Sequence, residues 1–286
     1  MSVVEIPFKK SQTANLKLAL KNYINKEYGA AEAAKYDDDL NFINNSRKSA
    51  TLVNSASENG RKSLEDYIAL LSTIENLFPI SEKDINLPFT WHDSFVPSKN
   101  KRLCSIIYDK ACIYYNLAVL ESCQSYNSDM NTEAGLKSAF QHFTLSAGIF
   151  LHIRDGISPN ISGVMTPDLS PTGLTMAYTI MIAQAQGCCF ERFLRQKKTP
   201  ANKKSGLLAK IAIQASEYFR AAAELASSPD MVHNVEKSFS GKLSFQKYVY
   251  TAHGEYWQAE EEHAIADEKG AGYGGVIARL EAALKS

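Results

Sequence analysis

A glycine-rich segment near the C-terminus, KGAGYGG, places Gly270, Gly272 and Gly275 in the spacing G-x-G-x-x-G. In dinucleotide-binding folds such glycines directly follow a β-strand, and the backbone approaches a pyrophosphate at the start of a helix. The residues before this segment, EYWQAEEEHAIADEK, instead have the composition of a polar helix. The spacing is therefore predicted to mark a flexible turn between two helices.

Histidines are the next candidates for chemistry, as metal ligands or general bases, and the chain has six. None stands in the H-E-x-x-H spacing, in which two histidines share one face of a helix. His263 follows Glu260, Glu261 and Glu262. Because consecutive helix residues point in different directions, this run predicts a solvated charged face. We expect no metal and no cofactor.

The five cysteines could supply a nucleophile or disulfides. None forms a Cys-x-x-Cys pair, and the adjacent Cys188 and Cys189 cannot readily bridge to each other. No basic residue and orienting carboxylate stand at a recognisable spacing from either, and the chain has no G-x-S-x-G and no phosphate-binding loop. We therefore expect a non-enzymatic protein of the cytosol, in which thiols pack as small apolar groups.

Composition disfavours several other classes of protein. Because 31 Lys and Arg balance 31 Asp and Glu, no net charge draws the chain to nucleic acid. The N-terminus, MSVVEIPFKKS, lacks the pattern of a secretory signal, and no run approaches the roughly 18 apolar residues that cross a bilayer. No predicted helix carries the cluster of basic residues that favours direct lipid binding.

Helical periodicity fills most of the 286 residues. Two short β-prone runs, 3–8 and 87–95, are expected to pair in a small sheet. Thr13 could cap the first helix. Helices are predicted at roughly 13–29, 30–53, 58–78, 100–127, 132–155, 173–197, 205–227, 240–268 and 274–285. The fold class is therefore mainly α.

In the long helices, small residues alternate with aromatic residues at i, i+3 and i+4 spacing. Small side chains let antiparallel helices approach closely while the rings fill the holes between them, as in tetratricopeptide-like hairpins. The residues are Tyr114, Tyr115 and Ala118; Ala215, Tyr218, Phe219 and Ala222; and Ala252, Tyr256 and Ala259. Such stacks expose grooves that hold peptides and helices, so we expect a helical scaffold.

The segment 203–226 gives the sharpest indication of a binding surface. On a wheel of about 100° per residue with Leu207 at zero, a core-facing stripe falls between about 80° and 160°. Leu207 and Ile211 lie at the edge of this stripe, and Lys203 and Lys210 lie just beyond them. This edge suits an amphipathic partner helix with an acidic flank. Alternatively, the two aliphatic residues are core and the lysines are solvated.

Several segments, in order, carry a resemblance to a known family. They are the opening strand followed by KKS, then LPFTWHDSF, YDKACIYYNLAVL, GLKSAFQHFTLSAGIFLHIRD, MIAQAQGCCFERFL, LLAKIAIQASEYF and EYWQAEEEHAIADEKGAGYGGVIARL. The sequence resembles the BRO-one domain family, the N-terminal domain of Alix-like ESCRT adaptor proteins, over essentially its full length. The resemblance implies a curved, banana-shaped helical scaffold with a tetratricopeptide-like core and a small N-terminal β-sheet.

The resemblance also implies a function and a binding patch. Family members bind the C-terminal amphipathic helix of Snf-seven-type ESCRT-III subunits and act in multivesicular-body sorting at endosomes. The partner-binding positions that carry over to this sequence are Leu207, Ile211, Lys210, Arg192, Glu133, Lys137 and Cys189. Cys189 stands where the family has an aromatic residue, so the apolar surface is expected to be smaller. Lys203 joins the patch from the wheel alone.

We expect a single domain over residues 1–286 that ends short of the usual family boundary. Three other hypotheses stay open from the residues alone. The chain could be a membrane-surface scaffold, a tetratricopeptide-like adaptor for an unrelated peptide, or an enzyme with a deep pocket of converging titratable groups. Peripheral contact with endosomal membranes and the identity of the ESCRT-III subunit are likewise left open.

Overall fold

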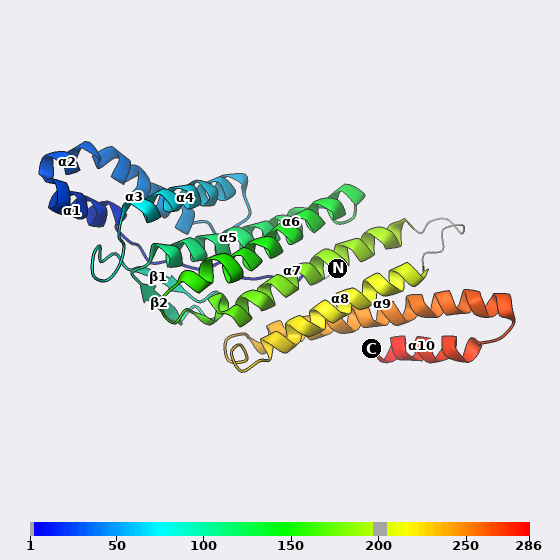
Figure 1. Cartoon of the computed structure of the whole chain (residues 1–286). Helices are drawn as coiled ribbons and strands as arrows, with labels where there is room; N and C mark the ends of the chain where they lie inside the picture. The colour runs from blue at the N-terminus through cyan, green and yellow to red at the C-terminus, as the bar shows by residue number, and fades with distance from the viewer. Residues whose placement is uncertain (1–2, 197–204) are drawn as a thin grey trace. The chain divides into compact units, whose positions relative to one another are not determined.

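The computed structural model describes residues 3–196 and 205–286 (Figure 1). Within these residues the chain forms ten α-helices and one two-stranded antiparallel sheet. The chain divides into two compact units. The sheet unit comprises Ile6–Cys123 and Gly148–Thr175, and the hairpin unit comprises Met1–Glu5, Gln124–Ala147 and Met176–Ser286. The predicted fold class, mainly α with a small sheet, is confirmed, and the extent of a single domain stays a prediction.

The sheet unit begins with four helices and a β-hairpin. Their bounds are α1 Leu16–Tyr28, α2 Ala30–Lys35, α3 Asp37–Thr51, α4 Glu58–Leu77, β1 Phe89–His92 and β2 Asn100–Leu103. The first helix is capped by Asn15, whose side chain accepts a hydrogen bond from the Leu18 N–H, and not by Thr13. Asn at this position satisfies one of the free N–H groups of the first turn.

The predicted pairing of 3–8 with 87–95 is wrong. Strand β1 pairs instead with β2, and an isolated bridge joins Ser11 to Trp91. The N-terminal segment meets β1 through the Gln12 N–H, which donates to the Thr90 carbonyl at 3.0 Å. Pro7 has no N–H to donate to a ladder, which disfavours a regular strand through 3–8.

Two lysines of α1 form ion pairs with Asp37 at the surface of the sheet unit. The Lys17 and Lys21 ammonium groups contact the Asp37 carboxylate at 2.7 and 2.5 Å and lower the pKa of Asp37 to about 2. Because the folded-state pKa lies below the ordinary value, this contribution to stability is present above about pH 3.8 and is lost as the pH falls through about 2. In a carboxyl NMR titration, replacing both lysines with Ala should return the pKa of Asp37 toward its ordinary value.

The remaining helices follow in chain order, and residues 153–170 form a long connection between two of them. They are α5 Ile106–Asn127, α6 Glu133–His152, α7 Pro171–Arg195, α8 Ser205–Ala226, α9 Lys237–Lys269 and α10 Tyr273–Lys285. The glycine-rich segment is the turn between α9 and α10, as predicted: Gly270 is in the left-handed conformation with φ 65°, and Gly272 has φ 107°. None of the described helices is both long enough and apolar enough to span a membrane.

In the hairpin unit, α8 is fixed firmly against α9. The Gly254 backbone approaches Ile213 so closely that a Cβ there would lie 2.3 Å from the Ile213 Cδ1 atom. At the start of α8, the Gly206 N–H donates to the Glu261 carboxylate at 3.0 Å. Stacking of Phe219 on Tyr250, with centroids 5.7 Å apart, fills the space between the two helices. This packing holds the first turns of α8 in a defined orientation.

Candidate functional site

Helix α8 presents one of its two predicted aliphatic anchors to solvent. Leu207 is 41% exposed, whereas Ile211 is 9% exposed. At about 40° from Leu207 on the wheel, Ile211 lies near enough to the core stripe to be covered by the neighbouring helix. The Gln186 side chain of α7 donates to the Ile211 carbonyl at 3.3 Å, which places α7 on that side of α8. The prediction of an exposed pair is therefore wrong for Ile211.

Cys189 and Arg192 lie on α7, near its C-terminal end. Cys189 is half-buried and Arg192 is exposed. Burial raises the pKa of the Cys189 thiol, and the nearby Arg192 charge opposes that rise only in part. The thiol therefore stays neutral at physiological pH and acts as a small apolar surface.

Glu133 and Lys137 lie one turn apart at the start of α6, and both are exposed. The Arg192 guanidinium donates to the Glu133 carboxylate through Nε at 3.1 Å and Nη2 at 3.0 Å. This ion pair joins the first turn of α6 to the last turn of α7. We call the surface formed by Glu133, Lys137, Cys189, Arg192 and Leu207 the three-helix face.

Lys210 lies on the side of α8 that faces α9 and α10. It lines a hollow of about 370 Å³ with Gly254 and Gln258 of α9 and with Arg279 of α10. Lys203, the other predicted rim lysine, lies outside the described residues.

Sequence reasoning missed one exposed aromatic residue on α6. Phe140 is 37% exposed. It follows Glu133 by seven residues and Lys137 by three, the spacing that places all three on one side of a helix. This spacing is a signal that the sequence itself contains.

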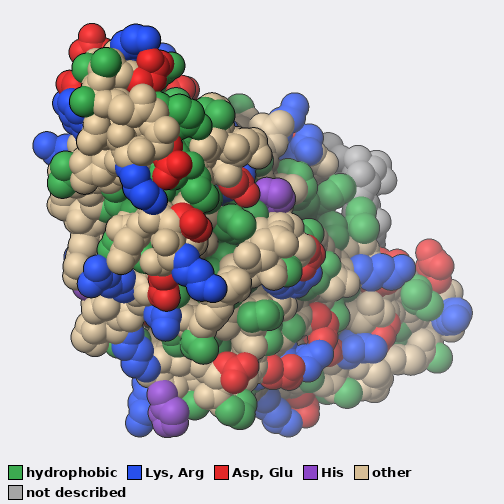
Figure 2. All heavy atoms as spheres, turned by 60° about the vertical axis from the view of Figure 1, so that its left-hand side comes forward, with side chains coloured by type: hydrophobic (Ala, Val, Ile, Leu, Met, Phe, Trp, Pro, Cys, Tyr) green, Lys and Arg blue, Asp and Glu red, His purple; other side chains and the backbone are tan. Residues whose placement is uncertain are grey.

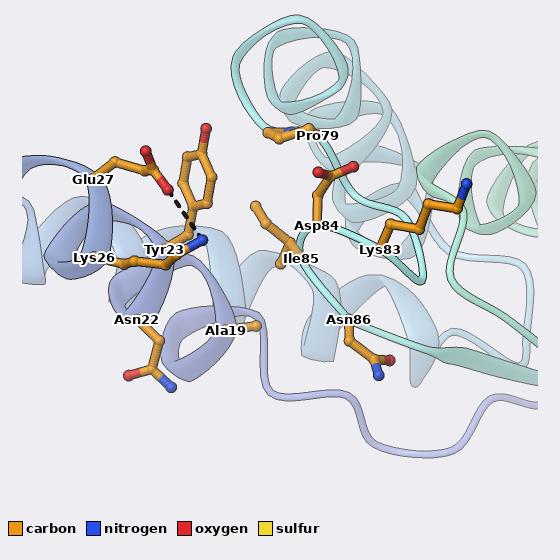
Figure 3. A pocket seen from close by; sticks show the side chains of 10 residues that line it. All are labelled: Ala19, Asn22, Tyr23, Lys26, Glu27, Pro79, Lys83, Asp84, Ile85 and Asn86. Carbon is orange, nitrogen blue, oxygen red and sulfur yellow. Dashed lines mark ion pairs between the residues drawn. The ribbon is translucent and has the colours of Figure 1, made fainter.

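Other hollows lie in the sheet unit, one lined mostly by polar side chains and another mostly by aromatic and aliphatic side chains that include Leu77 and Phe78. The one in Figure 3 has a volume of about 480 Å³ and lies in the sheet unit, between α1 and residues 79–86. Lys26 pairs with Glu27 at 3.3 Å, while Lys83 points away from both. In the described part of the chain, no group of three or more His, Cys, Asp or Glu residues could hold a metal ion.

Charges of both signs are interspersed on the face of the molecule drawn in Figure 2. On the face drawn in Figure 2, Lys and Arg side chains alternate with Asp and Glu. This distribution agrees with the balanced composition of 31 basic and 31 acidic residues. Neither sign of charge dominates this face.

Comparison with known sequences identifies relatives over almost the whole chain. The family model described as "BRO1-like domain" matches residues 3–286. The chain is 31% identical to "Vacuolar protein-sorting protein bro-1" of Neurospora crassa, covering 98% of this chain and 26% of that protein. It is 29% identical to "Programmed cell death 6-interacting protein" of Homo sapiens, covering 97% of this chain and 32% of that protein. The chain thus spans about a quarter to a third of these curated relatives.

Solved structures give the same result for the fold. The structure described as "ALIX BRO1 CHMP4C complex" has a TM-score of 0.83 and 28% identity, covering 100% of this chain and 79% of that chain. ALIX in complex with the SIVmac239 PYKEVTEDL late domain has a TM-score of 0.84 and 29% identity, covering 100% of this chain and 40% of that chain. Together with the family match over residues 3–286, these similarities establish that the chain belongs to the BRO1-like domain family.

Proposed function

We propose that the three-helix face binds the C-terminal amphipathic helix of an ESCRT-III subunit of the Snf-seven type. The chain then acts as a non-enzymatic adaptor in endosomal multivesicular-body sorting. It resides in the cytoplasm and reaches endosomal membranes through this partner. The similarity to ALIX BRO1 in complex with CHMP4C supports the choice of partner, and the vacuolar-sorting relatives support the choice of process.

The observation that carries the proposal is the exposure of Leu207. Leu207 is 41% exposed, and its helix is packed tightly against α9. The exposed part of this side chain does not stabilise the fold. Burying that exposed part against a partner's apolar ridge contributes about 1 kcal/mol to binding. A rigid helix adds little ordering cost on association, so this gain is retained.

The charges around Leu207 indicate the flank of the partner helix. Lys137 and Arg192 are cations on the three-helix face, and Arg192 already contacts Glu133. A carboxylate on the partner would compete with Glu133 for Arg192, while Lys137 offers a second cation. Exposed pairs of this kind contribute about 0–1 kcal/mol each and mainly affect orientation and association rate. The best-suited partner is therefore an apolar ridge with an acidic edge.

Replacing Leu207 with Asp is expected to weaken binding of a CHMP4C C-terminal helix peptide by about 100-fold or more. The substitution removes the apolar anchor and places a carboxylate against the partner's ridge. Isothermal titration calorimetry with the purified chain measures the dissociation constant. Because the side chain is well exposed, we expect the melting temperature to change little.

Val232 provides a matched control, since it is an aliphatic residue of the hairpin unit that is 44% exposed, outside the three-helix face. Val232→Asp should bind the peptide as the unsubstituted chain does. If Leu207→Asp binds equally well while remaining folded, the three-helix face is not the docking surface. If the unsubstituted chain does not bind the peptide, the choice of partner is wrong.

A further inference from the structure

We infer that Phe140 is a second apolar anchor of the three-helix face and contacts the opposite flank of the same partner helix. This inference rests on the function proposed above. In this arrangement, α6 contributes an apolar contact to partner binding in addition to its charged side chains.

The argument begins with the side of α6 on which Phe140 lies. The Ser138 hydroxyl contacts the Ser128 hydroxyl at 3.1 Å, so the Ser138 side of α6 faces the end of α5. The Glu133 side faces α7, because Glu133 contacts Arg192. At about 100° per residue, Phe140 lies within about 20° of Glu133 and far from Ser138. Its ring therefore lies on the edge of α6 that borders α7.

The contacts between helices also place Phe140 along the face. From the Glu133–Arg192 contact, Phe140 lies about 10 Å further along α6, at 1.5 Å per residue. Gln186 lies about 9 Å back along α7 from Arg192, and it contacts Ile211 of α8. Phe140, Gln186 and Ile211 therefore lie at about one level, and Leu207 lies about one turn nearer the ion pair.

Few large hydrophobic side chains of α6, α7 and α8 are exposed to solvent. Among the described residues of α6, α7 and α8, the large hydrophobic side chains that are exposed are Phe140, Leu145, Leu207 and Ile213. Ile213 lies on the α9 side, against Gly254. Leu145, at about 120° from Glu133, lies near the α5 side of α6. Phe140 and Leu207 remain as the two exposed anchors that border α7.

The position of these two anchors specifies the partner further. Phe140 and Leu207 stand on the helices that flank α7, so a helix lying over α7 would touch both. A narrow apolar seam reaches only one of them. The partner therefore needs a broad apolar stripe, with residues at i, i+3, i+4 and i+7, to contact α6 and α8 together.

The small side chain of Cys189 fits this arrangement. Cys189 is half-buried and lies on α7, between the two anchors in level. Its small side chain leaves room for a partner side chain above α7, while Phe140 supplies aromatic area from the neighbouring helix. Placing a ring at residue 189 should therefore replace part of what Phe140 contributes.

The test measures binding of the CHMP4C C-terminal helix peptide to four variants by calorimetry. Phe140→Ala is expected to weaken binding about tenfold, and Phe140→Leu by less, because Leu keeps much of the apolar area. Leu145→Ala is the matched control, at 43% exposure on the same helix, and should bind as the unsubstituted chain does. In the Phe140→Ala background, Cys189→Phe should recover several-fold of the loss.

The outcomes separate the inference from the proposed function. If Leu207→Asp abolishes binding while Phe140→Ala binds normally, the partner helix docks without α6 apolar contact, and the inference is overturned. If Phe140→Ala and Leu145→Ala weaken binding equally, the effect is not specific to the α7 edge, and the inference is again overturned. If the unsubstituted chain fails to bind, the proposed function fails and the inference with it. Thermal melting of each variant identifies any loss of folding.

Discussion

Replacing Asp109 with Ala is expected to destabilise the sheet unit by about 3–5 kcal/mol, because it removes one partner of a buried ion pair. Asp109 lies on α5 and is completely buried. Its carboxylate accepts hydrogen bonds from the Arg47 guanidinium at 2.9 and 3.2 Å, from the Tyr67 hydroxyl at 2.8 Å and from the Trp91 indole N–H at 2.7 Å.

The partners of Asp109 explain the size of the expected effect. Burial by itself lowers the pKa of the Arg47 guanidinium, yet the Asp109 charge raises it overall, so Arg47 stays charged inside the unit. Without the carboxylate, the Arg47 charge loses its ion-pair partner, and the buried Tyr67 and Trp91 donors lose their acceptor. The three partners come from α3, α4 and β1, so the loss loosens the packing of all three on α5.

Urea unfolding followed by circular dichroism measures this effect. Asp66 supplies the control, because it is exposed and directly precedes Tyr67 in α4, and Asp66→Ala should change the free energy of unfolding by about 0.5 kcal/mol or less. Asp109→Asn keeps the side-chain volume and should lose less than Asp109→Ala. An Asp109→Ala chain as stable as the Asp66→Ala chain would contradict the assigned role of the network.

Much of the fold was predictable from local pattern, because each long helix carries its own apolar period. The helices α8 and α10 begin and end within about two residues of the predicted bounds. The sheet was not predictable in this way. Its pairing depends on which segments meet in space, and the pattern predicts a helix from residue 100, whereas residues 100–103 form β2. Nothing local distinguished those four residues from a first helical turn.

The candidate site was predictable to a smaller extent. A helical wheel locates Leu207 and Ile211 relative to a stripe, but it contains no information on which neighbouring helix covers the edge. Burial of Ile211 depends on α7, which contributes Gln186 at that level. The position of Phe140 beside α7 likewise depends on the Glu133–Arg192 contact between helices. Whether these residues bind a partner stays a prediction.

Replacing Ile211 with Asp is expected to destabilise the hairpin unit by about 3–5 kcal/mol. The side chain is 9% exposed, so the substitution loses the burial of an aliphatic residue and encloses a carboxylate. The neighbouring Leu207→Asp should cost far less, since Leu207 is 41% exposed. Two substitutions of the same kind, one helical turn apart, are thus expected to differ strongly in stability.

Thermal melting of the two Asp variants, with Ile211→Val as the conservative comparison, measures this difference. Ile211→Val should cost about 0.5–1.5 kcal/mol, as for other buried methyl groups. A melting temperature for Ile211→Asp equal to that of Leu207→Asp would mean that position 211 is open to solvent and free to act as an anchor. With the expected result, loss of partner binding by Ile211→Asp would follow from unfolding and carry no information about docking. Leu207 and Phe140 are therefore the positions at which recognition and folding can be measured separately.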